Sequence, residues 1–161
     1  MEKHKCSCCA GHTEKGVVPQ CPECKNNGVA VEFDTVVSLA IPSARKNLAS
    51  GEYFLCTDPD CPTAYYCRDT GKGLSIKEVS VPLHYKTSAK IKYACYCNKL
   101  TFSEAISTAR KKGVSNWAQV VKEAKGKLGP CSCETKNPFG KCCSGNSFAE
   151  AMRGITAKTK K

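Results

Sequence analysis

Short apolar runs bounded by turn residues dominate the first half of the chain. Residues 29–33 alternate like a strand, while residues 52–55 (after the leading Glu52) and 64–67 are brief runs of apolar and aromatic residues. Such runs are typical of strands that are half or fully buried. Residues 74–83 predict a further strand, in which the apolar phase slips at residues 77–78. That slip predicts a β-bulge or a bend.

Helical periodicity governs most of the second half. Apolar side chains recur every three or four residues after residue 101 and again after residue 115, which predicts two amphipathic helices. A capping-box sequence precedes the first of them, and a similar one lies at residues 147–150. The predicted helix boundaries are Asp34 or Thr35 to Pro42, Thr101 to Gly113, Ser115 to Gly129, and a start at Ser147. Strands followed by helices indicate an α+β protein with a β-rich first part and a helical second part.

Fourteen cysteines in 161 residues is far above ordinary usage. Either a secreted disulfide scaffold or a set of metal sites in a reducing compartment would explain it. The residues after Met1 lack the apolar core of a signal peptide, and no run approaches the ~18 apolar residues of a membrane span. We therefore expect a cytoplasmic protein without membrane insertion, whose thiols are reduced and largely ligated.

The charge is divided unevenly between the two halves. Residues 1–89 contain ten basic and ten acidic residues, whereas residues 90–161 contain fifteen basic and four acidic residues. The whole excess of +11 therefore lies in the second half. This division supports two modules, at residues 21–89 and 90–161, preceded by a cysteine-rich tail at residues 1–20. A basic half also favours a protein partner with an acidic face, although a merely solvated basic surface explains the charge equally well.

Two cysteine pairs in the first module have the spacing of a structural zinc site. Cys21 and Cys24 form a CxxC knuckle, and Cys56 and Cys61 supply two more thiols. Zn²⁺ takes four thiolates in a tetrahedron, and paired turns deliver two each. A closed set of four leaves no open position for catalysis. A redox CxxC disulfide is the alternative, but it does not account for the second pair. Cys67 lies on a predicted strand, where a cysteine is usually a small buried hydrophobe.

The second module carries two further thiol groups, separated by the helical segment. Cys95 and Cys97 form one, and the other lies in a segment too rich in turn residues to predict a helix or a strand. A [2Fe–2S] cluster needs two thiolates for each iron, and these groups can supply them. The candidates for the second pair of ligands are Cys131, Cys133, Cys142 and Cys143. Four backbone N–H groups are candidate hydrogen-bond donors to the sulfurs, namely those of Gly140, Ser144, Gly145 and Asn146.

The order of these motifs resembles the N-terminal region of CopZ-type copper chaperones. In that family a zinc-binding domain precedes a [2Fe–2S] domain similar to bacterioferritin-associated ferredoxin. The resemblance covers residues 18–150 and rests on residues 21–24, 51–54, 56–61, 93–97 and 133–143. It implies that Cys95, Cys97, Cys133 and Cys143 bind the cluster, which leaves Cys131 and Cys142 spare.

Two features depart from that family: the end of the chain, and the presence of four candidates, Cys131, Cys133, Cys142 and Cys143, for the last two cluster ligands. The chain ends in a lysine-rich tail, with no heavy-metal-associated domain and no Met-x-Cys-x-x-Cys loop. We therefore expect it to lack the usual copper-delivery site. The thiols of Cys6, Cys8 and Cys9 are a candidate substitute that could hold Cu(I), near His4 and His12. The simpler interpretation is an unstructured tail whose thiols bind nothing.

The predicted function is one-electron transfer, soft-metal (copper) handling, or both, by a protein with one [2Fe–2S] centre and one zinc ion. An electron-relay subunit of a larger oxidoreductase is an alternative. A basic zinc-ribbon protein that binds nucleic acid is another, although the positive charge lies outside the ribbon and aromatic residues are few. Independent catalysis is not expected, because the chain lacks a P-loop, a dinucleotide fingerprint and a nucleophile elbow, and its histidines, including His84 in the predicted link at residues 82–88, lie in poor contexts.

Overall fold

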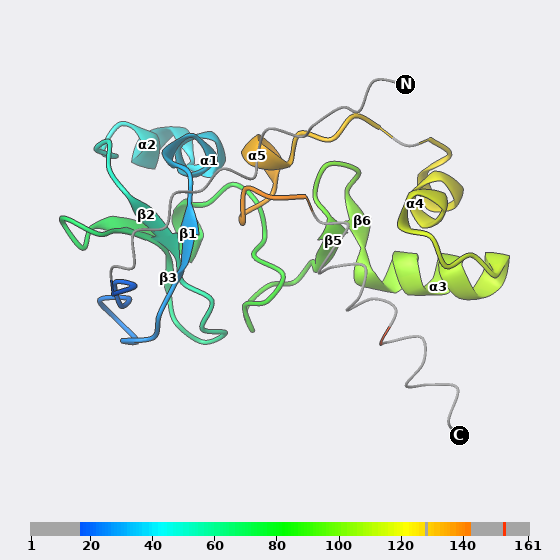
Figure 1. The fold of residues 1–161 in the computed structure, drawn as a ribbon, viewed down its shortest axis with the longest axis horizontal. Helices are drawn as coiled ribbons and strands as arrows, with labels where there is room; N and C mark the ends of the chain where they lie inside the picture. The colour runs from blue at the N-terminus through cyan, green and yellow to red at the C-terminus, as the bar shows by residue number, and fades with distance from the viewer. Residues whose placement is uncertain (1–16, 128, 143–152, 154–161) are drawn as a thin grey trace.

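A computed structural model describes residues 17–127, 129–142 and 153 of the chain (Figure 1). It has the predicted α+β character. A four-stranded sheet with two short helices forms one end of the molecule, and a hairpin with two longer helices forms the other. No helix among the described residues is long and apolar enough to cross a membrane.

The sheet is antiparallel, with the strand order β1-β2-β3-β4. Its strands are short, at Val29–Val31, Tyr53–Leu55, Thr63–Cys67 and Gly73–Ser75. Aromatic and β-branched residues supply most of β2 and β3, and both strands are almost wholly buried. Glycine is required at position 73, because a Cβ atom there would lie 1.9 Å from the backbone oxygen of Tyr65 on the neighbouring strand.

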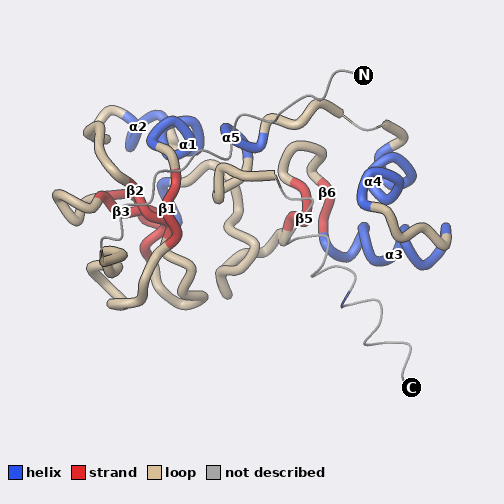
Figure 2. The backbone as a smooth tube through the Cα atoms, in the orientation of Figure 1, coloured by secondary structure: helices blue, strands red, loops and turns tan. Residues whose placement is uncertain are grey.

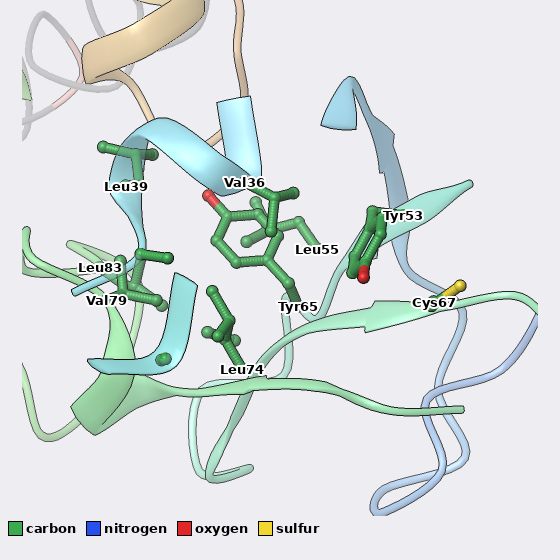
Figure 3. Close-up of a cluster of buried hydrophobic side chains, with 12 residues drawn as sticks. Val36, Leu39, Tyr53, Leu55, Tyr65, Cys67, Leu74, Val79 and Leu83 are labelled. Carbon is green, nitrogen blue, oxygen red and sulfur yellow. The ribbon is translucent and has the colours of Figure 1, made fainter. Parts of the chain in front are cut away.

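Two helices, α1 (Phe33–Leu39) and α2 (Pro42–Arg45), follow β1 and cover one face of the sheet (Figure 1). Their buried side chains pack with those of β2, β3 and β4 in the main hydrophobic core. Figure 3 shows Tyr65 within this core, with Val36, Leu55 and Leu74 around it. Cys67 is 2 % exposed and belongs to the same core, so the prediction that it is a buried hydrophobe is confirmed.

The second end begins with the hairpin formed by β5 (Tyr93–Cys95) and β6 (Leu100–Thr101). The helices α3 (Phe102–Lys112) and α4 (Trp117–Lys125) follow and pack against each other in a separate hydrophobic cluster (Figure 2). The predicted capping box is present, since the Thr101 hydroxyl accepts a hydrogen bond from the Glu104 amide and the Glu104 carboxylate accepts one from the Thr101 amide. The helix α3 ends at Gly113, as predicted, and Gly113 takes the left-handed conformation.

A short helix, α5 (Cys133–Lys136), ties the two ends together. It comes from the second half of the chain but packs beside α1, between the sheet and the hairpin (Figure 1). The Thr35 hydroxyl donates to the backbone oxygen of Glu134 at 2.7 Å. The buried Tyr65 hydroxyl donates to the oxygen of Pro138 at the same distance. The segment that follows Cys131 is therefore built partly against the core of the first half.

Several predicted local features are wrong in informative ways. Cys133 to Lys136 form one helical turn, although the segment was expected to be wholly irregular. Thr35 does not cap α1, because its hydroxyl bonds to Glu134 instead, and α1 begins at Phe33. The expected bulge at residues 77–78 is a 3₁₀ turn, Ile76–Glu78, closed by its own capping box.

The boundaries of α4 also differ from the prediction. Asn116 rather than Ser115 caps it, since the Asn116 side chain accepts from the amide of Gln119. The helix ends earlier than Gly129, because Gly126 adopts a left-handed conformation with φ 76°. The helix predicted to start at Ser147 lies outside the described residues.

Candidate metal centres

The first candidate centre begins with the Cys21–Cys24 knuckle, which is a tight turn. The Cys21 amide donates to the oxygen of Asn26 at 2.9 Å, and the Lys25 amide donates back to the oxygen of Cys21 at 3.0 Å. Lys25 takes a positive φ of 63°, which turns the chain into β1. Within this turn, the backbone N–H groups of Cys24 and Glu23 bond to the Cys21 sulfur.

The second knuckle follows β2 and is organised by Asp58. One oxygen of its carboxylate accepts from the amides of Asp60 and Cys61, both at 3.0 Å. The other oxygen accepts from the Asn26 side chain at 2.7 Å, which joins the two knuckles directly. The Cys56 amide donates to Ala64 at 2.8 Å, so the knuckle is anchored to β3 at its base.

The two knuckles bring four thiols together. The Sγ atoms of Cys21 and Cys61 are 3.9 Å apart, and those of Cys24 and Cys56 are 3.6 Å apart. All four sulfurs lie within 4.8 Å of one another. An ion bonded to four sulfurs at about 2.3 Å in a tetrahedron needs neighbouring sulfurs about 3.8 Å apart. The donor set and its spacing therefore fit Zn²⁺, with Phe54 covering the site from the sheet.

Lys86 completes this centre from a segment predicted to be a mere link. Its side chain is 1 % exposed. The ammonium donates to the backbone oxygen of Asp58 at 2.6 Å and to that of Cys61 at 3.0 Å. It thus places a buried positive charge on the knuckle that carries two of the thiols. A zinc ion with four thiolates is formally about −2, so a cation at this position offsets charge that would otherwise be buried unpaired.

The thiols differ in how easily they lose a proton. Burial alone would raise the pKa of Cys21, but the backbone N–H groups of Cys24 and Glu23, with the Cys56 thiol, outweigh it and lower that pKa to about 7. Burial raises the pKa of Cys24 and, more strongly, that of Cys56. Metal binding removes this penalty, because the ion takes the place of the protons.

The second candidate centre starts at the β5–β6 hairpin, whose turn carries Cys97 just after the buried Cys95. Lys99 takes a positive φ of 50° in this turn. The Asn98 side chain donates to the Cys95 sulfur at 3.3 Å and accepts from the Gly129 amide at 3.1 Å. Asn98 therefore bridges the hairpin to the chain that leads into the second thiol group.

That second group meets the hairpin at Cys133. The sulfurs of Cys97 and Cys133 are 3.5 Å apart, although 36 residues separate them in the sequence. Cys133 is 7 % exposed and begins α5. Cys131, Cys133 and Cys142 also lie within 4.8 Å of one another, with Cys131 and Cys142 exposed. The two thiol groups predicted to share a cluster thus lie at one place in the fold.

Among the described residues, two donors that the sequence did not predict form hydrogen bonds to the sulfurs of the second centre. The Ser132 amide donates to the Cys97 sulfur at 3.3 Å, and the Asn98 side chain donates to the Cys95 sulfur. The Gly140 amide was predicted to face a sulfur, but it donates to the oxygen of Asn137 at 2.8 Å and closes a turn. The other predicted donors, Ser144, Gly145 and Asn146, lie outside the described residues, as does Cys143.

The remaining predicted ligands divide into two cases. Cys6, Cys8 and Cys9, with His4 and His12, lie outside the described residues. His84 is not simply solvated, since it is half-buried among aromatic rings. Its amide donates to the Tyr96 hydroxyl at 3.1 Å, and its Nδ1 atom lies 3.2 Å from the same oxygen. The Tyr96 hydroxyl donates in turn to Pro82, so this network anchors the hairpin to the first half.

The ten cysteines within the described part of the chain form no disulfide with one another. The spacing of the cysteines in the sequence predicted which thiols group together. It did not predict Lys86, Asn98 or Ser132, whose contacts with the centres arise only from the tertiary path and leave no local motif.

Comparison with known proteins assigns the first half of the chain. Residues 18–80 match the family of CopZ zinc binding domains. The copper chaperone CopZ of Archaeoglobus fulgidus is 27 % identical over 126 residues, which are 77 % of this chain but only 57 % of that protein. The X-ray structure of the CopZ N-terminal domain from the same organism superposes with a TM-score of 0.63. It is 24 % identical, over 83 % of this chain and 97 % of that one. Residues 18–80 therefore match the zinc binding domain of CopZ, and the described chain shares the fold of a CopZ N-terminal domain.

Proposed function

We propose that this chain is a metal-handling redox protein that carries one structural zinc ion and one [2Fe–2S] cluster and acts on a soft cargo ion such as Cu(I). The observation that carries the proposal is the 3.5 Å approach of Cys97 to Cys133. Sulfurs at that separation, from two thiol groups far apart in sequence, supply ligands for a shared cluster.

Zinc is assigned to the four thiolates of Cys21, Cys24, Cys56 and Cys61. Three of them are buried, and their packing leaves the ion no open position for a substrate. A closed tetrathiolate site is structural. Its role here is to hold the sheet and the second knuckle, against which the later segments pack.

The cluster is assigned to Cys95, Cys97, Cys133 and Cys143. When bound, it supplies a single reversible electron. The residues around it set the conditions for that electron. Ser132 and Asn98 donate hydrogen bonds to the sulfurs, which favours the reduced and more negative form.

The basic second half fits a partner with an acidic face. Exposed Lys111 and Lys122 lie on α3 and α4, and only part of the positive charge there is paired, through Lys112–Glu123 and Lys125–Glu104. Such a surface steers encounter with an acidic redox or metal-trafficking protein. Cysteines that form no disulfide with one another, together with soft-metal chemistry, fit a reducing compartment, for which we propose the cytoplasm.

The proposal is tested on protein purified and reconstituted without oxygen. We expect a red-brown protein that is bleached by dithionite, with about two irons and one zinc per chain. A colourless protein that retains zinc alone would contradict the redox half of the proposal. Loss of zinc from the intact protein would contradict the structural half.

A further inference from the structure

Two thiols at the second centre stand apart from the proposed cluster ligands. Cys131 and Cys142 are exposed, whereas Cys95 and Cys133 are buried. The sulfurs of Cys131 and Cys142 nevertheless lie within 4.8 Å of each other and of Cys133. Eleven positions of chain separate them, so this proximity comes from the fold of the segment and not from their spacing.

Asn137 builds the turn that returns Cys142 to Cys131. Asn137 is 5 % exposed, and its side-chain amide spans the loop, donating to the oxygen of Lys141 at 2.8 Å and accepting from the Phe139 amide at 3.0 Å. Gly140 takes a φ of 64° and bonds back to Asn137. Because α5 and Pro138 are also bound to the first half, the approach of the two thiols is fixed before any ion arrives.

The ligand type selects the ion. Two thiolates on opposite sides of one ion lie at most roughly 4.6 Å apart, if the bonds are as long as those to zinc. The spacing of Cys131 and Cys142 permits that arrangement. Zinc requires four ligands, whereas a soft monovalent ion is satisfied by two or three thiolates. Cu(I) is the biological ion of that class.

We propose that the thiols of Cys131 and Cys142 form an exposed Cu(I) site at the rim of the cluster. This inference rests on the proposed function for the identity of the cargo, but it concerns cysteines that the cluster does not use. Exposure suits a cargo that is handed on, because a thiolate of a partner protein can reach the ion and replace one ligand at a time. No electron is transferred in that exchange. One copper–sulfur bond forms as another breaks, and the released thiolate takes up a proton.

The test uses the full chain, reconstituted without oxygen with iron, sulfide and zinc. Cu(I) is titrated in competition with the chromogenic chelator bathocuproine disulfonate. The wild type is compared with the double variant C131S/C142S and with the triple variant C6S/C8S/C9S, which removes the other spare thiols. Electron paramagnetic resonance of the reduced protein reports the cluster, and zinc content reports the first centre.

We expect C131S/C142S to keep the cluster signal and the zinc while losing one equivalent of bound Cu(I) per chain. The triple variant should keep that equivalent. Unchanged Cu(I) binding in C131S/C142S would overturn the inference, and so would loss of the cluster signal, since these cysteines would then be iron ligands. If the wild type contains no cluster but binds one equivalent of Cu(I) that C131S/C142S does not bind, the redox half of the proposed function is refuted while the copper site stands.

Discussion

Replacing Lys86 by methionine tests how far the zinc centre extends beyond its four thiols. The change keeps most of the aliphatic stem but removes a buried ammonium and its two hydrogen bonds, at 2.6 Å to Asp58 and 3.0 Å to Cys61. A hydrogen bond from a charged donor contributes about 1.5–3 kcal/mol, and two that share one ammonium are less than additive. We therefore expect the zinc-loaded protein to lose about 3 kcal/mol of unfolding free energy.

The same change should weaken zinc binding itself. The ammonium offsets part of the charge of a tetrathiolate that is formally about −2, and this benefit exists only when the ion and its thiolates are in place. Loss of an outer-shell partner of this kind typically costs 10–100-fold in metal affinity, or about 1.4–2.8 kcal/mol. Competition with a zinc chelator measures the affinity, and urea unfolding of the loaded protein measures the stability.

Two matched variants make this experiment decisive. Lys72→Met removes a lysine of the same half that is exposed, and it should change neither quantity. Lys86→Arg keeps the charge and should recover part of the lost affinity. The reasoning is refuted if Lys86→Met lowers stability but leaves zinc affinity within about twofold of wild type, because the lysine would then only pack.

Three further predictions follow from the contacts of the two centres. The lowered pKa of Cys21 leaves it a thiolate above about pH 7 and a thiol below it, so zinc binding should displace one additional proton below that pH. The plot of log zinc affinity against pH should therefore become steeper below about pH 7, and a plot of constant slope would refute this. Tyr65→Phe removes the buried bond to Pro138 and should cost about 1 kcal/mol of stability and speed cluster loss on dilution, whereas Tyr93→Phe should not speed that loss. Asn98→Ala removes a donor to a cluster sulfur, so potentiometry should find a more negative reduction potential, and an unchanged potential would show that this bond does not tune the cluster.

The parts of this fold that could be predicted depend on local signals. The Cys21–Cys24 knuckle, the capping box of α3 and its glycine stop each lie within a few residues of sequence, so pattern alone locates them. Strands β2 and β3 were found for the same reason, because buried runs rich in aromatic residues are distinctive.

The rest depends on contacts between distant segments. Thr35 looks like a helix cap, but its hydroxyl is taken by Glu134, 99 residues away. The residues around Lys86 were predicted to be a link, because no nearby sequence motif indicates that the Lys86 ammonium contacts the second knuckle. The β5–β6 hairpin was missed because its strands are only three and two residues long. No single-sequence pattern encodes such pairings, which the thiol centres and their neighbours stabilise jointly.

The meeting of the two thiol groups at one [2Fe–2S] cluster is tested most directly by electron paramagnetic resonance of the dithionite-reduced protein and its single Cys→Ser variants. The wild type should give one signal from a single unpaired electron per chain. Cys97→Ser and Cys133→Ser, which alter sulfurs 3.5 Å apart, should each abolish or shift it, while Cys67→Ser in the core of the sheet should leave it unchanged. A wild-type signal that survives unaltered in both Cys97→Ser and Cys133→Ser would contradict the account.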